Sequence, residues 1–151
     1  MGTINIVKNI KEIHKEDIAI IKIGKFYNIY GKDAYITSYL LGYKIIEVEG
    51  IKTCAFPEVS LKKVCAKLED NKINYLIVDR RNNYEVDEMS TNRNLNNYEK
   101  FYHKAKNYVN IRFRIEKVYQ TLLEDVDKPQ FLDYLRKMEE VQNEGRKIQS
   151  N

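Results

Sequence analysis

The stretch DIAIIKIGKFYNIYGKDAYITSYLLG, residues 17–42, decides the fold class of this chain. Its first part is mostly apolar and β-branched, which predicts a buried strand that ends at Gly24. The next segment, Lys25–Tyr30, predicts a second strand. Asp33 is suited to cap a helix that ends before Gly42, because aspartate is a preferred N-cap and glycine a preferred residue after a helix. Two strands followed by a helix indicate an α/β arrangement.

The aromatic residues of the second strand raise a question of function. Strand alternation places Phe26, Asn28 and Tyr30 on one face and Tyr27 and Ile29 on the other. Strand aromatics are usually half-buried packing residues. The alternative is that one ring is exposed and stacks on a ligand.

The rest of the N-terminal half follows the same α/β pattern. It predicts a helix over Ile4–Lys15, a hairpin turn at Glu49-Gly50, a helix over Ser60–Asp70 and a strand over Ile73–Asp79. We therefore expect one domain over residues 1–88, a mixed sheet of about five strands with packed helices.

The C-terminal part predicts only helix. After the polar, Asn-rich stretch of residues 80–97, apolar residues recur at steps of three and four along a long helix, with Arg112 inside the stripe: Phe101, Ala105, Tyr108, Ile115, Tyr119 and Leu122. Pro129 then opens a second helix, expected to fray after Gly145. Residues 89–151 are thus predicted to form a helical hairpin. Its apolar stripe must pack against the α/β domain, a partner protein or a second copy of the chain.

Composition limits the class of protein. The chain is 43% hydrophobic with six glycines and two prolines, which excludes a disordered or fibrous protein. It has no apolar run long enough to cross a membrane, and its N-terminus is too charged for a signal peptide. We expect a soluble, cytoplasmic protein in which Cys54 and Cys65 are unpaired, small buried residues.

The sequence contains no enzyme signature. Gly24-Lys25 and Gly31-Lys32 lack the spacing of a phosphate-binding P-loop, and His14 and His103 are isolated. We expect no catalytic residue, no metal site and no cofactor.

The segment of residues 17–79 resembles the N-terminal mismatch-recognition domain of the MutS family of DNA mismatch repair proteins. The family motif is a strand ending in glycine, a phenylalanine-tyrosine-glutamate segment, an acidic residue opening a helix, and paired leucines. Here the matching residues are Gly24, Phe26-Tyr27-Asn28, Asp33 and Leu40-Leu41. The later stretch TCAFPEVSLKKVCAKLEDNKINYLIVD is similar to the turn, helix and strand that follow in the family.

The resemblance implies a role for Phe26 and Asn28. In the family, the phenylalanine wedges into the minor groove and stacks on a mispaired base, and the glutamate hydrogen-bonds that base. Phe26 would be the stacking ring, and Asn28 stands where the family has glutamate. Asparagine still offers a donor and an acceptor to a base edge, so the substitution affects mismatch discrimination more than nucleic-acid binding.

The basic residues are unevenly distributed. Residues 89–151 have 12 basic and 9 acidic residues, against 14 and 13 in residues 1–88. We expect the nucleic-acid-binding cations to be Lys25 and Lys32 beside Phe26, and Lys100, Lys104 and Arg114 on the long helix. The alternative for that helix is an ordinary solvated face whose rings, Tyr98 and Tyr102 among them, pack on neighbours.

Two classes of function follow. The first is a non-enzymatic nucleic-acid-binding or accessory protein, with DNA favoured over RNA, that lacks the ATPase and clamp of the MutS family and assembles with itself or a partner through the C-terminal helices. The second is a protein-interaction adaptor that keeps the fold without DNA contact. Small MutS-like proteins are associated with diversity-generating retroelements, which would make a reverse transcriptase the partner.

Overall fold

The computed structural model describes residues 2–90 and 96–150, with the side chain of Ser150 left out. The elements, in chain order, are α1 (Thr3–Ile13), β1 (Ile18–Ile23), β2 (Phe26–Tyr30), α2 (Lys32–Leu41), β3 (Ile46–Val48), β4 (Ile51–Pro57), η1 (Glu58–Ser60), α3 (Leu61–Asp70), β5 (Tyr75–Asp79), η2 (Arg80–Asn82), β6 (Val86–Met89), α4 (Tyr98–Glu124) and α5 (Phe131–Ser150). The predicted class, a mixed α/β domain with C-terminal helices, is confirmed.

The described strands form one mixed sheet in the order β3-β4-β2-β1-β5-β6. β1 pairs in parallel with β5 and antiparallel with β2, and β2 pairs antiparallel with β4. The sheet has one strand more than the expected five or so, because β6 forms within the polar, Asn-rich stretch of residues 80–97. Residues 91–95 of that stretch lie outside the described residues.

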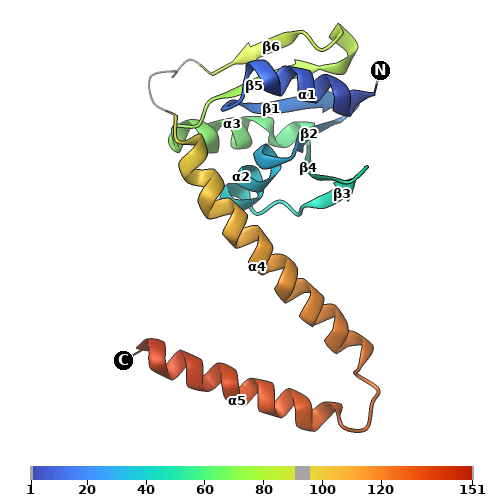
Figure 1. Ribbon diagram of the computed structural model, residues 1–151, viewed down its shortest axis with the longest axis vertical. Helices are drawn as coiled ribbons and strands as arrows, with labels where there is room; N and C mark the ends of the chain where they lie inside the picture. Colours follow the sequence, from blue (N-terminus) through green and yellow to red (C-terminus); the bar gives the residue numbers. More distant parts are fainter. Residues whose placement is uncertain (1, 91–95, 151) are drawn as a thin grey trace. The chain divides into compact units, whose positions relative to one another are not determined.

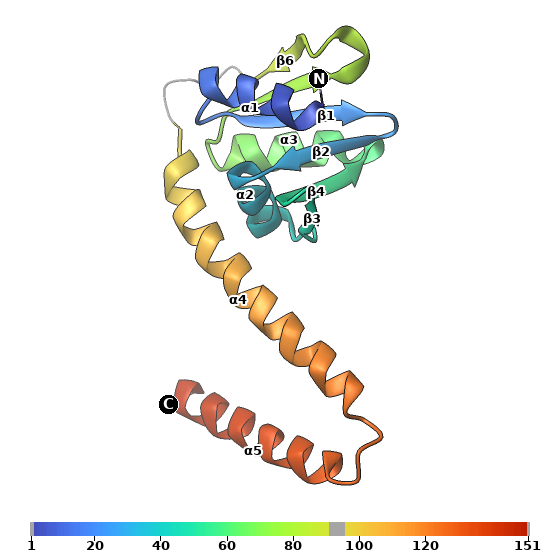
Figure 2. The same ribbon diagram turned by 45° about the vertical axis from the view of Figure 1, so that its right-hand side comes forward.

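Helices cover both faces of the sheet (Figures 1 and 2). On one face, Val7 of α1 packs on Ile21 and Val78. On the other, α2, α3 and the first turns of α4 bury a larger cluster. Its fully buried members include Ile29, Ile36, Phe56, Val64, Leu68 and Tyr98. β1 and β5 are therefore buried on both faces, as their nearly continuous apolar sequences predict.

Two local expectations are corrected. α2 begins at Lys32, and the side chain of Asp33 does not cap it; that carboxylate instead accepts the backbone N–H of Ala19 on β1. α5 does not fray after Gly145 but runs to Ser150. The predicted glycine after α2 is confirmed: Gly42 ends the helix with φ of 80°, in the left-handed region that favours glycine.

The chain divides into two compact units, residues 1–110 and residues 111–151. The first half of α4 belongs to the first unit, because Ala105 and Val109 are buried in its core. The domain boundary expected between residues 88 and 89 stays a prediction. In the described part of the chain, no helix is both long and apolar enough to cross a membrane.

Candidate nucleic-acid interface

Phe26 lies at the tip of the β1–β2 hairpin. It is paired with Ile23, and only Gly24 and Lys25 connect the two strands. Gly24 has φ of 62°, so this tight connection uses the left-handed region that glycine adopts most readily. The hairpin therefore positions Phe26 at the first residue of β2, where it pairs with Ile23 of β1 and Pro57 of β4.

The ring of Phe26 is exposed, whereas its strand neighbours are core residues. Its exposed fraction is 52%, while Tyr27 and Ile29, on the opposite face of β2, are buried. Tyr27 stacks on Phe56 with 5.5 Å between ring centroids. Within this one strand, Tyr27 is therefore a core residue, whereas the ring of Phe26 is exposed and can contact a ligand.

Asn28 lies on the same face of β2 as Phe26, two residues further along the strand. Strand geometry separates the two Cα atoms by about 6.6 Å. Asn28 is half-buried between its cross-strand partners Ile21 and Ala55. The structure therefore brings together Lys25, Phe26 and Asn28 of the predicted site.

Cations surround the hairpin tip, and two of them are paired. Lys22 Nζ lies 3.8 Å from Glu58 Oε2, and the Arg81 guanidinium lies 3.3 Å from Asp79 Oδ2. Asp79 also accepts the backbone N–H of Arg81, and these contacts hold the pKa of Asp79 below its usual range. Lys22 and Arg81 are thus neutralised locally.

Arg80 and Lys25 are two further cations at this edge, and both are exposed. Neither makes a hydrogen bond through its side chain, or an ion pair, with the part of the chain that the structure describes. Arg80 follows Asp79, whose parallel partner on β1 is Lys22, so Arg80 lies level with the hairpin tip. β1 separates β5 from β2, which places Arg80 about 10 Å from Phe26 across the sheet.

Arg80 was missed by the sequence reasoning. The available signal was the pair Arg80-Arg81 directly after a buried strand. Its relevance depends on the parallel pairing of β1 with β5, which joins segments more than 50 residues apart. A single sequence does not show that pairing.

Lys32 lies at the other end of β2. It follows the strand, at least 13 Å along the sheet from Phe26 by strand geometry, and its Nζ sits 4.7 Å from the centroid of the Tyr102 ring. Lys32 therefore does not flank Phe26, as the sequence predicted, but lies where α2 meets α4.

The two predicted lysines of α4 lie at that same α2–α4 contact. Lys100 and Lys104 are exposed, with their amines 6.0 and 5.7 Å from the centroid of the Phe101 ring. Arg114 is exposed and belongs to the second compact unit. The predicted cations are thus divided among three places, and of these cations only Lys25 adjoins Phe26.

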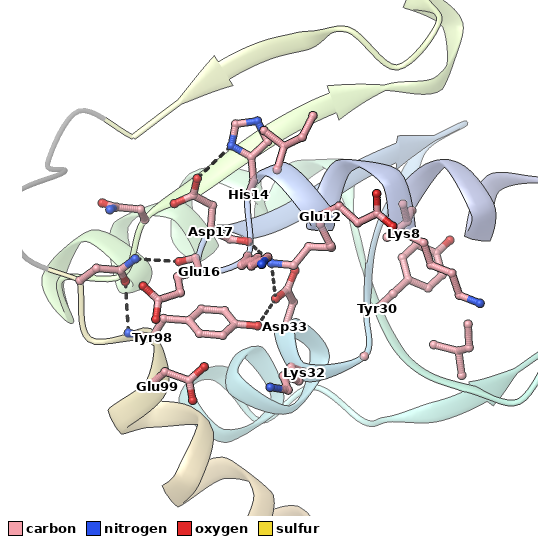
Figure 3. A pocket seen from close by; sticks show the side chains of 18 of the residues that line it. Lys8, Glu12, His14, Glu16, Asp17, Tyr30, Lys32, Asp33, Tyr98 and Glu99 are labelled. Atoms are coloured by element: carbon pink, nitrogen blue, oxygen red, sulfur yellow. Dashed lines mark hydrogen bonds and ion pairs between the residues drawn. The ribbon is translucent and has the colours of Figure 1, made fainter.

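Tyr98 is not part of a basic aromatic surface, because it is buried. Its hydroxyl donates a hydrogen bond to Oδ1 of the buried Asp33, which also lies 3.0 Å from Lys11 Nζ (Figure 3). Burial raises the pKa of Asp33, and the charge of Lys11 and the hydrogen bonds from Ala19 and Tyr98 oppose that rise. Asp33 thus links α1, β1, α2 and α4, which is a structural role.

The groove beside Asp33 has mixed charge. It has a volume of about 1110 Å³ and runs between α1, the start of α2 and the start of α4 (Figure 3). Four lysines and five carboxylates line it: Lys8, Lys11, Lys15, Lys32, Glu12, Glu16, Asp17, Asp33 and Glu99. Because the lysines do not outnumber the carboxylates, this groove does not have the electrostatics of a polyanion site. Among the described residues, no cluster of histidine, cysteine and carboxylate side chains is arranged to hold a metal ion.

Comparison with known families identifies the first unit. Residues 1–99 match the family model of MutS domain I. Because the match covers about two thirds of the chain, the protein belongs to the MutS domain I family. This confirms the resemblance seen over residues 17–79 and extends it to α1, η2 and β6. A comparison with curated proteins finds no match.

Proposed function

We propose that this protein is a non-enzymatic nucleic-acid-binding module that stacks Phe26 on a base and acts in the cytoplasm as an accessory factor. Family membership indicates a role like that of mismatch recognition. The observation that carries the proposal is the exposure of Phe26 at the tip of a paired hairpin, at the position where the family has its stacking phenylalanine. Aromatic stacking on a base is worth about 1–3 kcal/mol and tolerates any base.

The surroundings of Phe26 fit a DNA backbone. Lys25 directly precedes Phe26 in the hairpin turn, and Arg80 follows β5, which is separated from β2 by β1 alone, so both cations lie at the same edge of the sheet as Phe26. DNA is favoured over RNA because a wedge in the minor groove suits a B-form duplex, whose base steps can be unstacked at a cost of a few kcal/mol. Asn28 in place of glutamate predicts weak discrimination between matched and mismatched duplexes, since its amide both donates and accepts hydrogen bonds.

Fluorescence anisotropy tests this proposal. The probes are matched duplex, mismatched duplex, single-stranded DNA and RNA, each measured over a salt series with wild type, Phe26→Leu and Phe26→Trp. Leucine keeps the apolar volume without an aromatic face, so we expect a loss of roughly 10-fold in affinity, whereas tryptophan should retain or improve binding. Phe113→Leu, which alters another exposed phenylalanine, is the matched control and should bind like wild type.

Equal binding by wild type and Phe26→Leu would refute the stacking role. Absence of binding to every probe at low salt would refute the nucleic-acid function and favour the adaptor. The observation that favours an adaptor is the second compact unit, where no described side chain from residue 111 to residue 149 is buried.

A further inference from the structure

The first half of α4, residues 98–110, has an exposed side made mostly of cationic and amide side chains. Its buried residues Tyr98, Ala105 and Val109 define the side that packs on the α/β domain. Apart from Glu99 and Tyr108, the exposed side chains of this half are those of Lys100, His103, Lys104, Lys106, Asn107 and Asn110. This side of the helix therefore offers positive charge and hydrogen-bond donors, which suit an anionic ligand.

The lysines of α2 and of this half of α4 are not matched by carboxylates. Residues 3–17, around α1, have three lysines and three carboxylates, and so do residues 58–70, around α3. By contrast, α2 and residues 98–110 together have four lysines and only two carboxylates, Asp33 and Glu99. Asp33 is buried and paired with Lys11 of α1. The positive charge is thus concentrated where these two helices meet.

Aromatic rings line both flanks of this charged side. On one flank, Tyr102 stacks on Tyr35 of α2 with 6.3 Å between ring centroids. On the other, Tyr39 of α2 lies 6.4 Å from Phe101 and 5.3 Å from Tyr108, centroid to centroid. The three rings Tyr35, Tyr39 and Tyr102 are half-buried, and Tyr108 is 36% exposed. Part of each tyrosine ring is therefore accessible to a ligand.

The rings also position the lysine amines. Lys32 Nζ lies 4.7 Å from the centroid of Tyr102, and the amines of Lys100 and Lys104 lie 6.0 and 5.7 Å from that of Phe101. None of these three lysines makes an ion pair with the part of the chain that the structure describes. Lys100 and Lys104 are also four residues apart, a spacing at which like charges destabilise a helix. A bound polyanion would remove that repulsion.

We infer that α2 and the first half of α4 form a second nucleic-acid site, which binds an unpaired strand. This α2–α4 surface consists of Lys32, Lys100, Lys104, Lys106, Tyr102 and Tyr108. Its lysines contact phosphates and its tyrosine rings stack on bases, the combination by which proteins bind single strands without reading their sequence. A duplex keeps its bases stacked on one another, so it would leave the rings unused. Lys32 lies at the opposite end of β2 from Phe26, so this inference does not rest on stacking by Phe26.

Anisotropy with a labelled oligothymidylate and the full chain tests this inference. The variant that combines Lys100→Gln with Lys104→Gln should lose affinity roughly 10-fold or more at about 0.1 M salt. Its slope of log affinity against log salt should fall by about 1.4, the value for two phosphate contacts on a single strand. The control combines Lys63→Gln with Lys67→Gln, the same charge change at the same spacing on the exposed side of α3, and should bind like wild type. Equal losses in the two variants, or no loss in the first, would overturn the inference.

Lysine footprinting locates the site directly. Acetylation of lysines, read by mass spectrometry, should be suppressed by oligothymidylate at Lys32, Lys100 and Lys104 and remain unchanged at Lys67. Phe26→Leu should show the same protection, so the stacking role of Phe26 and the α2–α4 surface can fail separately. Binding of oligothymidylate without protection of the three lysines, or no binding of it, would overturn the inference. Equal protection by a duplex of the same length would overturn the preference for an unpaired strand.

Discussion

At the scale of single residues, the proposed function gives Phe26 and Arg80 different kinds of contact with nucleic acid. A stacking ring contributes affinity that depends weakly on salt, whereas a cation on a phosphate contributes by releasing counterions. The two contributions are separable by measuring affinity as a function of salt concentration.

For Arg80 we predict a change in salt dependence. Arg80→Gln should lower the slope of log affinity against log salt by about 0.9 for duplex DNA, the value for one phosphate contact. Phe26→Leu should lower affinity and leave the slope unchanged. Anisotropy titrations at four or more salt concentrations measure both. Arg136→Gln, an exposed arginine of α5, is the control and should keep the wild-type slope. An unchanged slope in Arg80→Gln would remove Arg80 from the interface.

For Tyr98 we predict a loss of stability. Tyr98→Phe removes a donor to the buried Asp33 and should lower the free energy of unfolding by about 1–3 kcal/mol in urea denaturation. Tyr134→Phe, at an exposed tyrosine, should have no such effect.

The effect of Tyr98→Phe should also depend on pH. The Tyr98 hydroxyl favours the charged form of Asp33, so it works to lower a pKa that burial has raised. Removing the Tyr98 hydroxyl raises the folded-state pKa of Asp33 further. The variant therefore loses stability at pH values at which Asp33 is ionised. The difference between variant and wild type should therefore be largest above the folded-state pKa of Asp33 and shrink as the pH falls through that pKa. A difference that grows on acidification would contradict this assignment.

At the scale of elements, the helices of this protein differ in what stabilises them. α1, α2 and α3 bury apolar faces on the sheet, so their sequence patterns and observed bounds agree within a few residues. α5 buries no side chain among its described residues, so its helicity depends more on the intrinsic propensity of each residue.

For Gly145 we predict a gain of helix stability. It lies in the interior of α5, with no atom within 4 Å of the position a Cβ would occupy and no positive φ. Gly145→Ala should therefore stabilise the helix by up to about 1 kcal/mol and raise the circular dichroism signal at 222 nm. Gly42→Ala provides the contrast, because φ of 80° makes alanine unfavourable there and stability should fall. No gain on Gly145→Ala would indicate that α5 ends earlier in solution.

At the scale of the whole molecule, the position of the domain boundary has a measurable consequence. The core that covers one face of the sheet includes Tyr98, Ala105 and Val109 of α4. A chain ending at residue 88 loses them and leaves that part of the core open to water, whereas a chain ending at residue 110 keeps them.

We predict that residues 1–110 fold cooperatively and that residues 1–88 are destabilised by several kcal/mol or fail to fold. Loss of Tyr98 alone removes a fully buried aromatic side chain, a change of the kind that costs about 3–5 kcal/mol in a core. Thermal and urea denaturation of the two truncated chains against the full chain measure this. Equal stability of the two would support the boundary between residues 88 and 89.

The amino-acid sequence by itself determined the α/β class, the β1–β2 hairpin, the helix ending at Gly42 and the family. These features follow from local patterns. Apolar residues alternate in strands, they recur at steps of three and four residues in helices, and glycine stands where the backbone has a positive φ. The sequence also placed Phe26 and Asn28 on one face of β2, because alternation in a strand has a fixed period.

Only the tertiary structure decided which residues join Phe26 and which do not. Lys32 is six residues from Phe26 in the chain but at the other end of the strand, while Arg80 is 54 residues away and at the same edge of the sheet. It also decided that Tyr98 is a core residue bound to Asp33 and that the stripe of α4 is covered only up to residue 110. The physical reason is that strand pairing and helix docking depend on contacts between distant segments, which one-dimensional patterns do not specify.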